Sequence, residues 1–463
     1  MPKFELDDTI AAIATPIGEG GISVVRLSGP GVCDCLRPFF ASSSKETVDS
    51  FLPNTIHWGK IRDSSGQVID QVLVSVFRAP NSYTGQDVLE VSCHGGLAVT
   101  KRILGLFLGN GARHAEPGEF TRRAFLAGKI DLAQAEAVLD LIRAKSSRSL
   151  ELAVRQLEGR LSQRFRKLKD SAMKLLAHME AYIDFPEEDL EVDVNDGMLA
   201  QFTDLKENMR TLLDGFERNQ RIREGVLVSI IGKPNAGKSS LFNALLERDR
   251  ALVSDIPHTT RDHLEEPLEI GGFYLRVRDT AGLISTAEHP LDKLGMIRTL
   301  RAVQDSHLLL FVVDGSCPLD DADRHVFKKI PEGKPFIVLI NKADLPMKLE
   351  EPELALMTRG AALIRVSAQT REGLKELERG ISRFLEKETG EEGEQITRLR
   401  HKDILEKALR SLEKAEKAFR EKTPLEFVTV ELREALDVMK ELTGEVYSEE
   451  LLDRIFSEFC IGK

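Results

Sequence analysis

The feature that most constrains the fold is the octapeptide GKPNAGKS, residues 232–239, which matches the pattern G-x-x-x-x-G-K-[ST]. It follows the apolar segment VLVSII and precedes SLFNALL, which has a helical pattern. In this setting glycines allow backbone N–H groups to converge on phosphate oxygens, and the N-terminal end of the helix adds positive potential. The pattern predicts a strand, a phosphate-binding loop and a helix, in which Lys238 contacts the β- and γ-phosphates and Ser239 binds Mg²⁺.

Two further motifs predict the nucleotide. The sequence NKAD, residues 341–344, follows the strand-like segment PFIVLI. The carboxylate of Asp344 can accept hydrogen bonds from N1–H and the exocyclic amine of guanine, whereas adenine offers neither there. Ser367 and Ala368 would complete the base pocket, and DTAG, residues 279–282, would supply an acid near magnesium and a glycine N–H for the γ-phosphate. Three motifs in this order, each at a strand end, predict a GTPase.

The segments around these motifs predict the domain organisation. Residues 223–384 alternate apolar strands with helical segments, which indicates a parallel sheet covered by helices. Residues 1–125 contain short strand-like segments and one helical segment, which indicates an α+β domain. Residues 126–222 and 385–463 have apolar residues at helical spacing. These two segments, which flank residues 223–384, are expected to form one domain together. The expected fold is multidomain: an α+β N-terminal domain, an α-helical central domain and an inserted α/β P-loop GTPase domain.

Composition and the N-terminal sequence limit the class of protein. With 463 residues, 42% hydrophobic and 30% charged, the chain has room for roughly two to four domains. Its first residues, MPKFELDD, are acidic where a secretory signal would be basic, and no apolar run approaches the length that spans a bilayer. Five cysteines, an odd number, indicate a reducing compartment. We expect a cytoplasmic protein without a membrane segment.

Charge is unevenly distributed along the chain. The net charge of −11 gives no general attraction to nucleic acid. Residues 143–174 nevertheless contain ten Lys or Arg residues against three acids. This stretch could contact a phosphate backbone, and a solvated helix face is the alternative interpretation.

The mechanism of hydrolysis is not expected to be of the Ras type. Ras-type enzymes place a water-orienting Gln in the second switch, whereas Leu283 follows Gly282 in this chain. The sequence assigns no arginine finger either. Another group must therefore orient the attacking water and neutralise the charge of the transition state.

The chain resembles the tRNA modification GTPases of the MnmE (TrmE) family over essentially its whole length. The resemblance rests on ATPIGEGGISVVRLSG, PNSYTGQDVLEVSCHGG, EPGEFTRRAFLAGKIDLAQAEA, PNAGKSSLFNAL, TTRD and the terminal FCIGK. It implies a folate-binding N-terminal domain, a helical domain split by the G domain, and a homodimer formed through the N-terminal domains. It also implies a flavoprotein partner, MnmG. With a one-carbon folate (5-formyl- or methylene-tetrahydrofolate), the pair adds an aminomethyl or carboxymethylaminomethyl group to carbon 5 of the wobble uridine of certain tRNAs.

The resemblance implies that K⁺ supplies the missing charge. The implied K⁺ ligands are Asn235, Ser254, the Ile256 carbonyl and Thr259. The implied Mg²⁺ ligands are Ser239 and Thr260. The motifs and the resemblance together give a GTP-binding set of Asn235, Ala236, Gly237, Lys238, Ser239, Ser240, Ser254, Asp255, Ile256, Pro257, His258, Thr259, Thr260, Asp279, Thr280, Ala281, Gly282, Asn341, Lys342, Ala343, Asp344, Ser367, Ala368 and Gln369.

The catalytic residues implied by the resemblance are Lys238, Thr260 and Asp292. The family usually has a water-orienting Glu in the second switch, and Asp292 falls in that place when the chain is aligned on the following Leu-Gly. Glu288 is the alternative. A second departure is His258, which stands where the family usually has a Gly before its two threonines and could stiffen this loop.

In the N-terminal part, Arg26, Glu90 and Lys129 fall on the family's folate-contacting positions. A carboxylate can pair with the amino-pyrimidine edge of a pterin, and cations suit the glutamate tail of a folate. Taken singly, each of these residues would more often be an ordinary surface charge.

The chain ends in FCIGK, residues 459–463. Cys460 has the position of a prenylated cysteine, but Lys463 is not one of the usual last residues of such a signal. The resemblance implies instead that this tail runs back toward the folate pocket, where Lys463 could contact the folate and Cys460 could be a reactive thiol. A small packed residue is the alternative for Cys460.

Two other functional classes are alternatives. A regulatory or ribosome-assembly GTPase would use GTP only to drive a conformational switch, but such relatives typically carry a KH domain or a second G domain, and neither is evident downstream. An N-terminal hydrolase is suggested by His94-Gly95-Gly96, but the sequence has no G-x-S-x-G motif. The expected function is therefore GTP hydrolysis coupled to tRNA modification.

Overall fold

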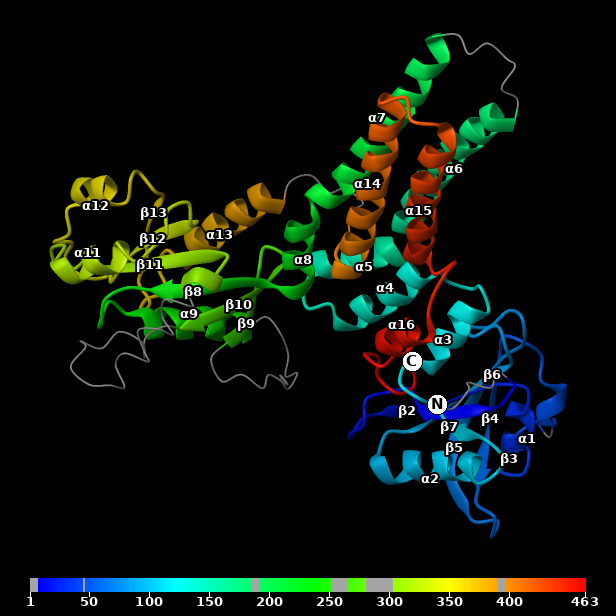
Figure 1. The fold of residues 1–463 in the computed structure, drawn as a ribbon. Coiled ribbons are helices and arrows are strands. Elements are labelled where there is room, and N and C mark those ends of the chain that lie inside the picture. Colours follow the sequence, from blue (N-terminus) through cyan, green and yellow to red (C-terminus); the bar gives the residue numbers. More distant parts are fainter. Residues whose placement is uncertain (1–6, 45, 185–191, 251–264, 280–302, 390–395) are drawn as a thin grey trace, which may run out of the picture. The chain divides into compact units, whose positions relative to one another are not determined.

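The structure, a computed structural model, describes residues 7–44, 46–184, 192–250, 265–279, 303–389 and 396–463 (Figure 1). The chain forms two compact units, each made of segments that are separate in sequence. The first unit comprises Met1–Ile142, Arg155–Lys206 and Ile404–Lys463, and the second comprises Arg143–Val154 and Glu207–Asp403. The fold class predicted from the sequence, with an α+β part, a helical part and an α/β part, is confirmed.

The N-terminal part of the first unit is a seven-stranded sheet with the strand order β3-β4-β5-β6-β2-β1-β7. Neighbouring strands are antiparallel except β1 and β7, which are parallel. The strands are β1 (Ile10–Ile13), β2 (Ile22–Ser28), β3 (Phe40–Ser42), β4 (Thr55–Arg62), β5 (Val68–Phe77), β6 (Val88–His94) and β7 (Arg113–His114). The helices are α1 (Val32–Leu36), the 3₁₀ turn η1 (Val48–Ser50), α2 (Leu97–Leu108) and α3 (Glu119–Leu126).

One face of this sheet is buried and the other is partly open. In β5, Val72, Val74 and Val76 are buried whereas Leu73 is exposed, because successive side chains of a strand point to opposite faces. Helix α2 contributes Ile103 and Phe107 to the buried side. The open face is therefore available for binding.

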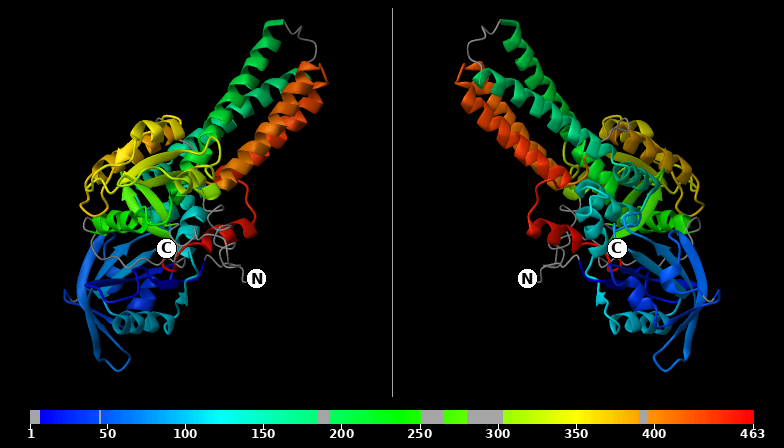
Figure 2. Two further views of the ribbon diagram at one scale, coloured as in Figure 1. Left: turned by 90° about the vertical axis from the view of Figure 1, so that its left-hand side faces the viewer. Right: turned by 90° about the vertical axis from the view of Figure 1, so that its right-hand side faces the viewer.

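The rest of the first unit is helical. Figure 2 shows α6, α14 and α15 side by side in both views. The helices of this part are α4 (Leu132–Arg143), α6 (Arg160–Asp184), α7 (Val192–Asp214), α14 (Leu399–Arg420), α15 (Leu425–Thr443) and α16 (Glu449–Phe456), of which α4, α7 and α14 belong partly to the second unit. The sequence predicted helices here from the spacing of apolar residues, and the structure buries Leu405, Leu412, Leu432 and Met439. No helix among the described residues is long and apolar enough to cross a membrane.

The second unit contains a six-stranded sheet with the order β13-β12-β11-β8-β10-β9. The strands are β8 (Val226–Ile231), β9 (Glu265–Ile270), β10 (Phe273–Asp279), β11 (Leu308–Asp314), β12 (Phe336–Asn341) and β13 (Leu363–Arg365). The predicted parallel arrangement is present from β13 to β10, and the edge strand β9, which was not predicted, pairs antiparallel with β10. The helices of this unit are α5 (Ser147–Leu157), α8 (Phe216–Glu224), α9 (Lys238–Arg250), α11 (Asp321–Phe327), α12 (Glu351–Met357) and α13 (Leu374–Thr389), of which α5 belongs partly to the first unit.

Apolar side chains cover both faces of the second sheet. One face packs Val228, Ile230 and Leu310 against helical residues that include Leu241 and Leu377. The other face has its own cluster of buried apolar residues, formed by Ile231, Leu309, Phe311, Val313, Val338, Ile340, Val326 and Leu354. This double burial explains why the central strands read as unbroken apolar runs.

Candidate functional site

The phosphate-loop sequence forms a tight connection between β8 and α9 (Figure 1). Asn235 and Gly237 have positive φ angles of 62° and 91°. A Cβ atom on Gly237 would lie 2.0 Å from Nδ2 of Asn341, so only glycine fits at this position. The loop is therefore held directly against the NKAD motif.

Lys238 is the first residue of α9, and its side chain returns to the loop. Its Nζ donates a 2.8 Å hydrogen bond to the carbonyl oxygen of Lys233, and the residue is only 5% exposed. The next two residues, Ser239 and Ser240, are exposed. Since the first turn of a helix leaves backbone N–H groups for an anion, this end of α9 is suited to bind phosphate.

Asn341 joins the phosphate loop to the loop that follows β13. Its Nδ2 donates to the Ala236 carbonyl at 2.8 Å, and its Oδ1 accepts from the Ala368 N–H at 3.2 Å. The Ser367 hydroxyl donates to Asp344 Oδ1 at 2.5 Å, which orients that carboxylate. Asp344 is exposed, as a residue that reads the edge of guanine must be. The structure thus brings the predicted base pocket and phosphate loop together.

A further contact of this site was not predicted from the sequence. Lys342, in the NKAD motif, lies with its Nζ 2.6 Å from Oδ2 of Asp314 at the end of β11. Burial would raise the pKa of Asp314, but hydrogen bonds from Lys342 and Ser316 outweigh it and lower the pKa. Asp314 is therefore charged at neutral pH and fixes Lys342. The acidic run DGSCPLDDAD after β11 was the available sequence signal.

Several predicted residues lie outside the described part of the chain. These are Ser254, Asp255, Ile256, Pro257, His258, Thr259, Thr260, Thr280, Ala281, Gly282, Glu288 and Asp292. The backbone of Asp279 is described and pairs with Ile230 of β8, at the edge of the sheet from which the phosphate loop starts. The described part of the chain contains no cluster of three or more His, Cys, Asp or Glu residues suited to a metal.

A second group of predicted residues meets on the N-terminal sheet. Arg26 on β2 and Glu90 on β6 face each other in register, and their Nε and Oε1 atoms lie 2.8 Å apart. The guanidinium of Arg26 also lies 5.6 Å from the ring centre of Phe120. With side chains 17% and 27% exposed, the pair is half-buried and remains accessible to a ligand.

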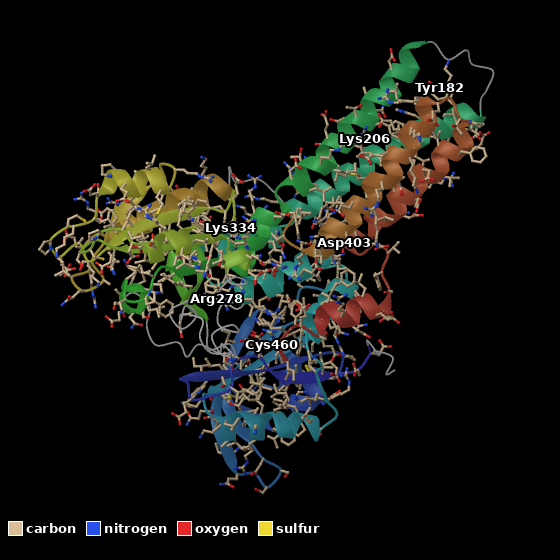
Figure 3. The ribbon with its side chains drawn as sticks, turned by 60° about the vertical axis from the view of Figure 1, so that its left-hand side comes forward. Tyr182, Lys206, Arg278, Lys334, Asp403 and Cys460 are labelled. Atoms are coloured by element: carbon tan, nitrogen blue, oxygen red, sulfur yellow. The ribbon has the colours of Figure 1, made fainter. Side chains whose placement is uncertain are left out.

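The FCIGK tail reaches this pair. Arg26 Nη1 donates to the Gly462 carbonyl at 3.1 Å, and the Phe120 N–H donates to the Lys463 carbonyl at 3.2 Å. Gly462 has a φ angle of 94°, and a Cβ atom there would lie 2.2 Å from the Ile13 carbonyl oxygen. The tail was predicted to run back to this site, and its backbone is indeed held there. Cys460 is exposed and lies beside the N-terminal sheet (Figure 3).

Lys129 stands apart from these contacts. It is exposed and lies next to Gly85, whose Cβ position would be 3.6 Å from Lys129 Cε. Tyr83, from the same loop, shares a 2.9 Å hydrogen bond with Thr121 on α3. Lys129 also lines a cavity of about 420 Å³ together with Arg166 and Tyr447. The sequence had not indicated Phe120 or Tyr83 as neighbours of the site.

Comparisons with known proteins match the whole chain. Two family models fit it: "GTP-binding protein TrmE N-terminus" over residues 9–129 and "MnmE helical domain" over residues 132–460. A protein from Carboxydothermus hydrogenoformans called tRNA modification GTPase MnmE is 43% identical, with 99% of this chain and 100% of that protein covered. The chain belongs to the MnmE family. Proteins of the same name from Heliobacterium modesticaldum and Bacillus subtilis are 44% and 40% identical, and each comparison covers 98% of this chain and at least 99% of the other protein.

Membership of the MnmE family agrees with the site described above. The phosphate loop and the NKAD motif, with the sheet on which they lie, make the chain a GTPase. Among solved structures, Era from Aquifex aeolicus bound to GDP and AlF4⁻ is 25% identical, with 42% of this chain and 66% of that chain covered and a TM-score of 0.29. The two family models and the full-length relatives confirm the family resemblance stated from the sequence motifs.

Proposed function

We propose that this chain is a cytoplasmic tRNA modification enzyme that hydrolyses GTP. Together with a flavoprotein partner, MnmG, it adds an aminomethyl or carboxymethylaminomethyl group to carbon 5 of the wobble uridine of certain tRNAs. The observation that carries the proposal is the FCIGK tail, which contacts Arg26 beside Glu90 in a chain that also contains a guanine nucleotide site. A GTPase that served only as a switch would have no use for this second site.

The proposed metal ligands fit hard cations. Ser239 and Thr260 would hold Mg²⁺, and Asn235, Ser254, Ile256 and Thr259 would hold K⁺. Asn235 and Ser239 are exposed at the mouth of the phosphate loop and present oxygen atoms, the ligands that such cations prefer. Bound K⁺ would supply positive charge where charge develops during hydrolysis. Asp292 would orient the water, with Glu288 as the alternative.

The folate proposal rests on the charges beside the tail. Glu90 presents a carboxylate that suits the amino-pyrimidine edge of a reduced folate, and Arg26 fixes its orientation. Lys129 and Lys463 would suit the glutamate part of the ligand, and Cys460 would lie near its one-carbon group. Calorimetry should show about tenfold weaker binding of 5-formyl-tetrahydrofolate by Glu90→Ala, the loss expected for one charged hydrogen bond. Unchanged affinity would remove Glu90 from the pocket.

A homodimer through the N-terminal domains is supported by the open face of that sheet. Trp58 on β4 lies opposite Leu73 on β5, and their exposed fractions are 53% and 45%. Ile56, on the same face, is 66% exposed. Exposed apolar side chains grouped in this way are typical of protein–protein interfaces.

Nucleoside analysis of tRNA tests the proposal. Cells that lack this protein should lose the modified wobble uridine and regain it when the wild-type chain is restored. Lys238→Ala, which removes the lysine of the phosphate loop, should fail to restore it. An unchanged wobble uridine in cells without the protein would favour the regulatory or ribosome-assembly GTPase instead.

A further inference from the structure

Lys233 occupies a variable position of the phosphate-loop pattern, yet its side chain is anchored inside the protein. Its Nζ lies 2.8 Å from Oδ2 of Asp320 and 2.8 Å from Oδ2 of Asp323. The Lys233 side chain is 11% exposed and that of Asp323 is 2% exposed. A surface lysine would be solvated and mobile, whereas this ammonium is held by two carboxylates.

Asp320 and Asp323 are themselves fixed by the first turn of α11. The Asp320 side chain accepts a 3.0 Å hydrogen bond from the Asp323 N–H, and the two residues form a capping box. Burial raises the pKa of Asp323, and it lowers the pKa of Lys233, but the two carboxylates outweigh this and raise the Lys233 pKa. Lys233 and the buried Asp323 therefore depend on each other, because a buried charge that lost its partner would be strongly destabilising.

The backbone of the same residue supports the phosphate-binding lysine. The Lys233 carbonyl oxygen accepts the 2.8 Å hydrogen bond from Lys238 Nζ and a 3.3 Å hydrogen bond from the Ala236 N–H. The side chain of Lys233 is thus bound to α11, while its carbonyl oxygen accepts hydrogen bonds from two later residues of the phosphate loop. A shift of this carbonyl would move Lys238, the group that meets the nucleotide phosphates.

The segment between β11 and α11 also holds the guanine motif. Asp314 binds Lys342, and the Gly315 N–H donates to the Asn341 carbonyl at 2.9 Å. Residues 314–323 therefore contact the phosphate loop through Lys233 and the NKAD motif through its first two residues. One short segment therefore contacts both parts of the nucleotide site, which also contact each other directly through Asn341 and Ala236.

We propose that Lys233 is a positioning residue for guanine nucleotide binding and GTP hydrolysis. Its ammonium, locked between Asp320 and Asp323, holds the phosphate loop in the binding conformation before the nucleotide arrives. Lys233 itself does not contact the nucleotide. This role rests on the GTPase activity of the chain. It assigns a function to a variable position of the motif, which itself specifies only the two glycines, the lysine and the serine.

The test compares variants of the full chain for the affinity for fluorescent GDP, kcat and KM for GTP, and the thermal unfolding temperature. Lys233→Met should weaken GDP binding about tenfold or more, since small displacements of positioned groups are costly. Lys233→Arg, which can donate to both carboxylates, should stay within about threefold of the wild type. The matched control is Arg324→Met, which removes a surface charge from α11 away from the loop and should leave affinity unchanged.

A double variant separates positioning from stability. In Lys233→Met/Asp323→Leu the buried charges are replaced by apolar groups, a change that often restores stability. Positioning by Lys233 predicts that the double variant unfolds near the wild-type temperature and still binds GDP about tenfold more weakly. Wild-type affinity in the double variant would overturn the proposal. Should Lys233→Met not fold, Asp320→Ala, at a half-exposed position, removes one of the two acceptors of Lys233 and provides the same comparison, and unchanged affinity there would also overturn the proposal.

A wild-type chain that failed to bind GDP would contradict the GTPase assignment itself, and with it the role of Lys233. Failure of the GTPase assignment and failure of the Lys233 proposal are therefore distinguishable, because the Lys233 proposal is judged only by differences in GDP affinity from a wild-type chain that binds GDP.

Discussion

At the residue scale, Asn235 stands out by its backbone conformation and by its exposed side chain. Its backbone is left-handed, with φ of 62°, a conformation that Asn tolerates better than most residues. Its side chain is exposed next to the buried Ala236, so an amide oxygen is presented at the surface of the phosphate loop. An amide oxygen and a hard cation are well matched.

This geometry leads to a prediction about monovalent ions. GTP hydrolysis should be faster in KCl than in NaCl, because the chain has no Gln after Gly282 and needs added positive charge. Asn235→Gly, which permits the left-handed backbone and lacks the amide oxygen, should lose most of this difference and keep its affinity for GDP. Steady-state phosphate release at matched ionic strength is the measurement. Equal wild-type rates in the two salts would remove K⁺ from the mechanism.

The water-orienting acid gives a second prediction. Asp292→Ala should lower kcat by about 10²-fold or more and leave nucleotide affinity nearly unchanged, the range expected for a positioned catalytic group. Glu288→Ala is the matched control four residues earlier. Single-turnover hydrolysis distinguishes the two. A large loss of kcat in Glu288→Ala, with a normal kcat in Asp292→Ala, would show that Glu288 and not Asp292 orients the water.

Residues of the nucleotide site differ in how far the sequence predicts them. Lys238, Asn341 and Asp344 belong to short motifs whose spacing reflects a local backbone geometry, so the pattern alone identifies them. Lys233 and Asp323 are 90 positions apart and meet only because the strand order places β8 beside β11. No local pattern encodes such a contact.

At the element scale, the hairpin β9–β10 is held by the segment that begins α5. The Arg148 guanidinium lies 4.3 Å from the ring centre of Phe273, and the Arg148 N–H donates to the Gly272 carbonyl at 3.2 Å. Lys145 Nζ lies 4.9 Å from the ring centre of Tyr274. In sequence, this hairpin stands between the TTRD and DTAG motifs. Two cations of the basic stretch 143–174, Lys145 and Arg148, therefore pack against this hairpin.

These contacts predict a loss of stability in the second unit. Arg148→Ala should lower its free energy of unfolding by about 1 kcal/mol, since a cation–π contact of this kind contributes about 0.5–2 kcal/mol. Glu151→Ala, at an exposed position of the same helix, is the control and should have little effect. Thermal unfolding of the full chain reports the change in the transition that GDP stabilises. Equal transitions in the two variants would show that the contact adds nothing to stability.

The elements of the second sheet show what periodicity predicts. Strands β8, β11 and β12 are buried on both faces and were evident as apolar runs. Strand β9, with the sequence EEPLEI, is an edge strand whose carboxylates and proline hid it. The contact of α5 with the hairpin is tertiary and left no periodic signal.

At the scale of the whole molecule, each unit carries one of the two candidate sites. The second unit holds the guanine nucleotide site, and the first holds the Arg26–Glu90 pair with the tail. Gly118 lies against the start of the tail: its N–H donates to the Cys460 carbonyl at 3.5 Å, and a Cβ atom at this position, where φ is 69°, would lie 3.1 Å from Cβ of Phe459. The two candidate sites therefore belong to different compact units of one chain.

The central claim is tested most directly by removing the tail. Cells whose only copy lacks residues 460–463 should have tRNA without the modified wobble uridine, because the backbone groups that bind Arg26 and Phe120 are gone. The purified truncated chain should hydrolyse GTP at nearly the wild-type rate, because the nucleotide site lies in the other unit. Loss of the modified uridine with GTP hydrolysis retained is the predicted result. A truncated chain that supports normal wobble-uridine modification would contradict the account.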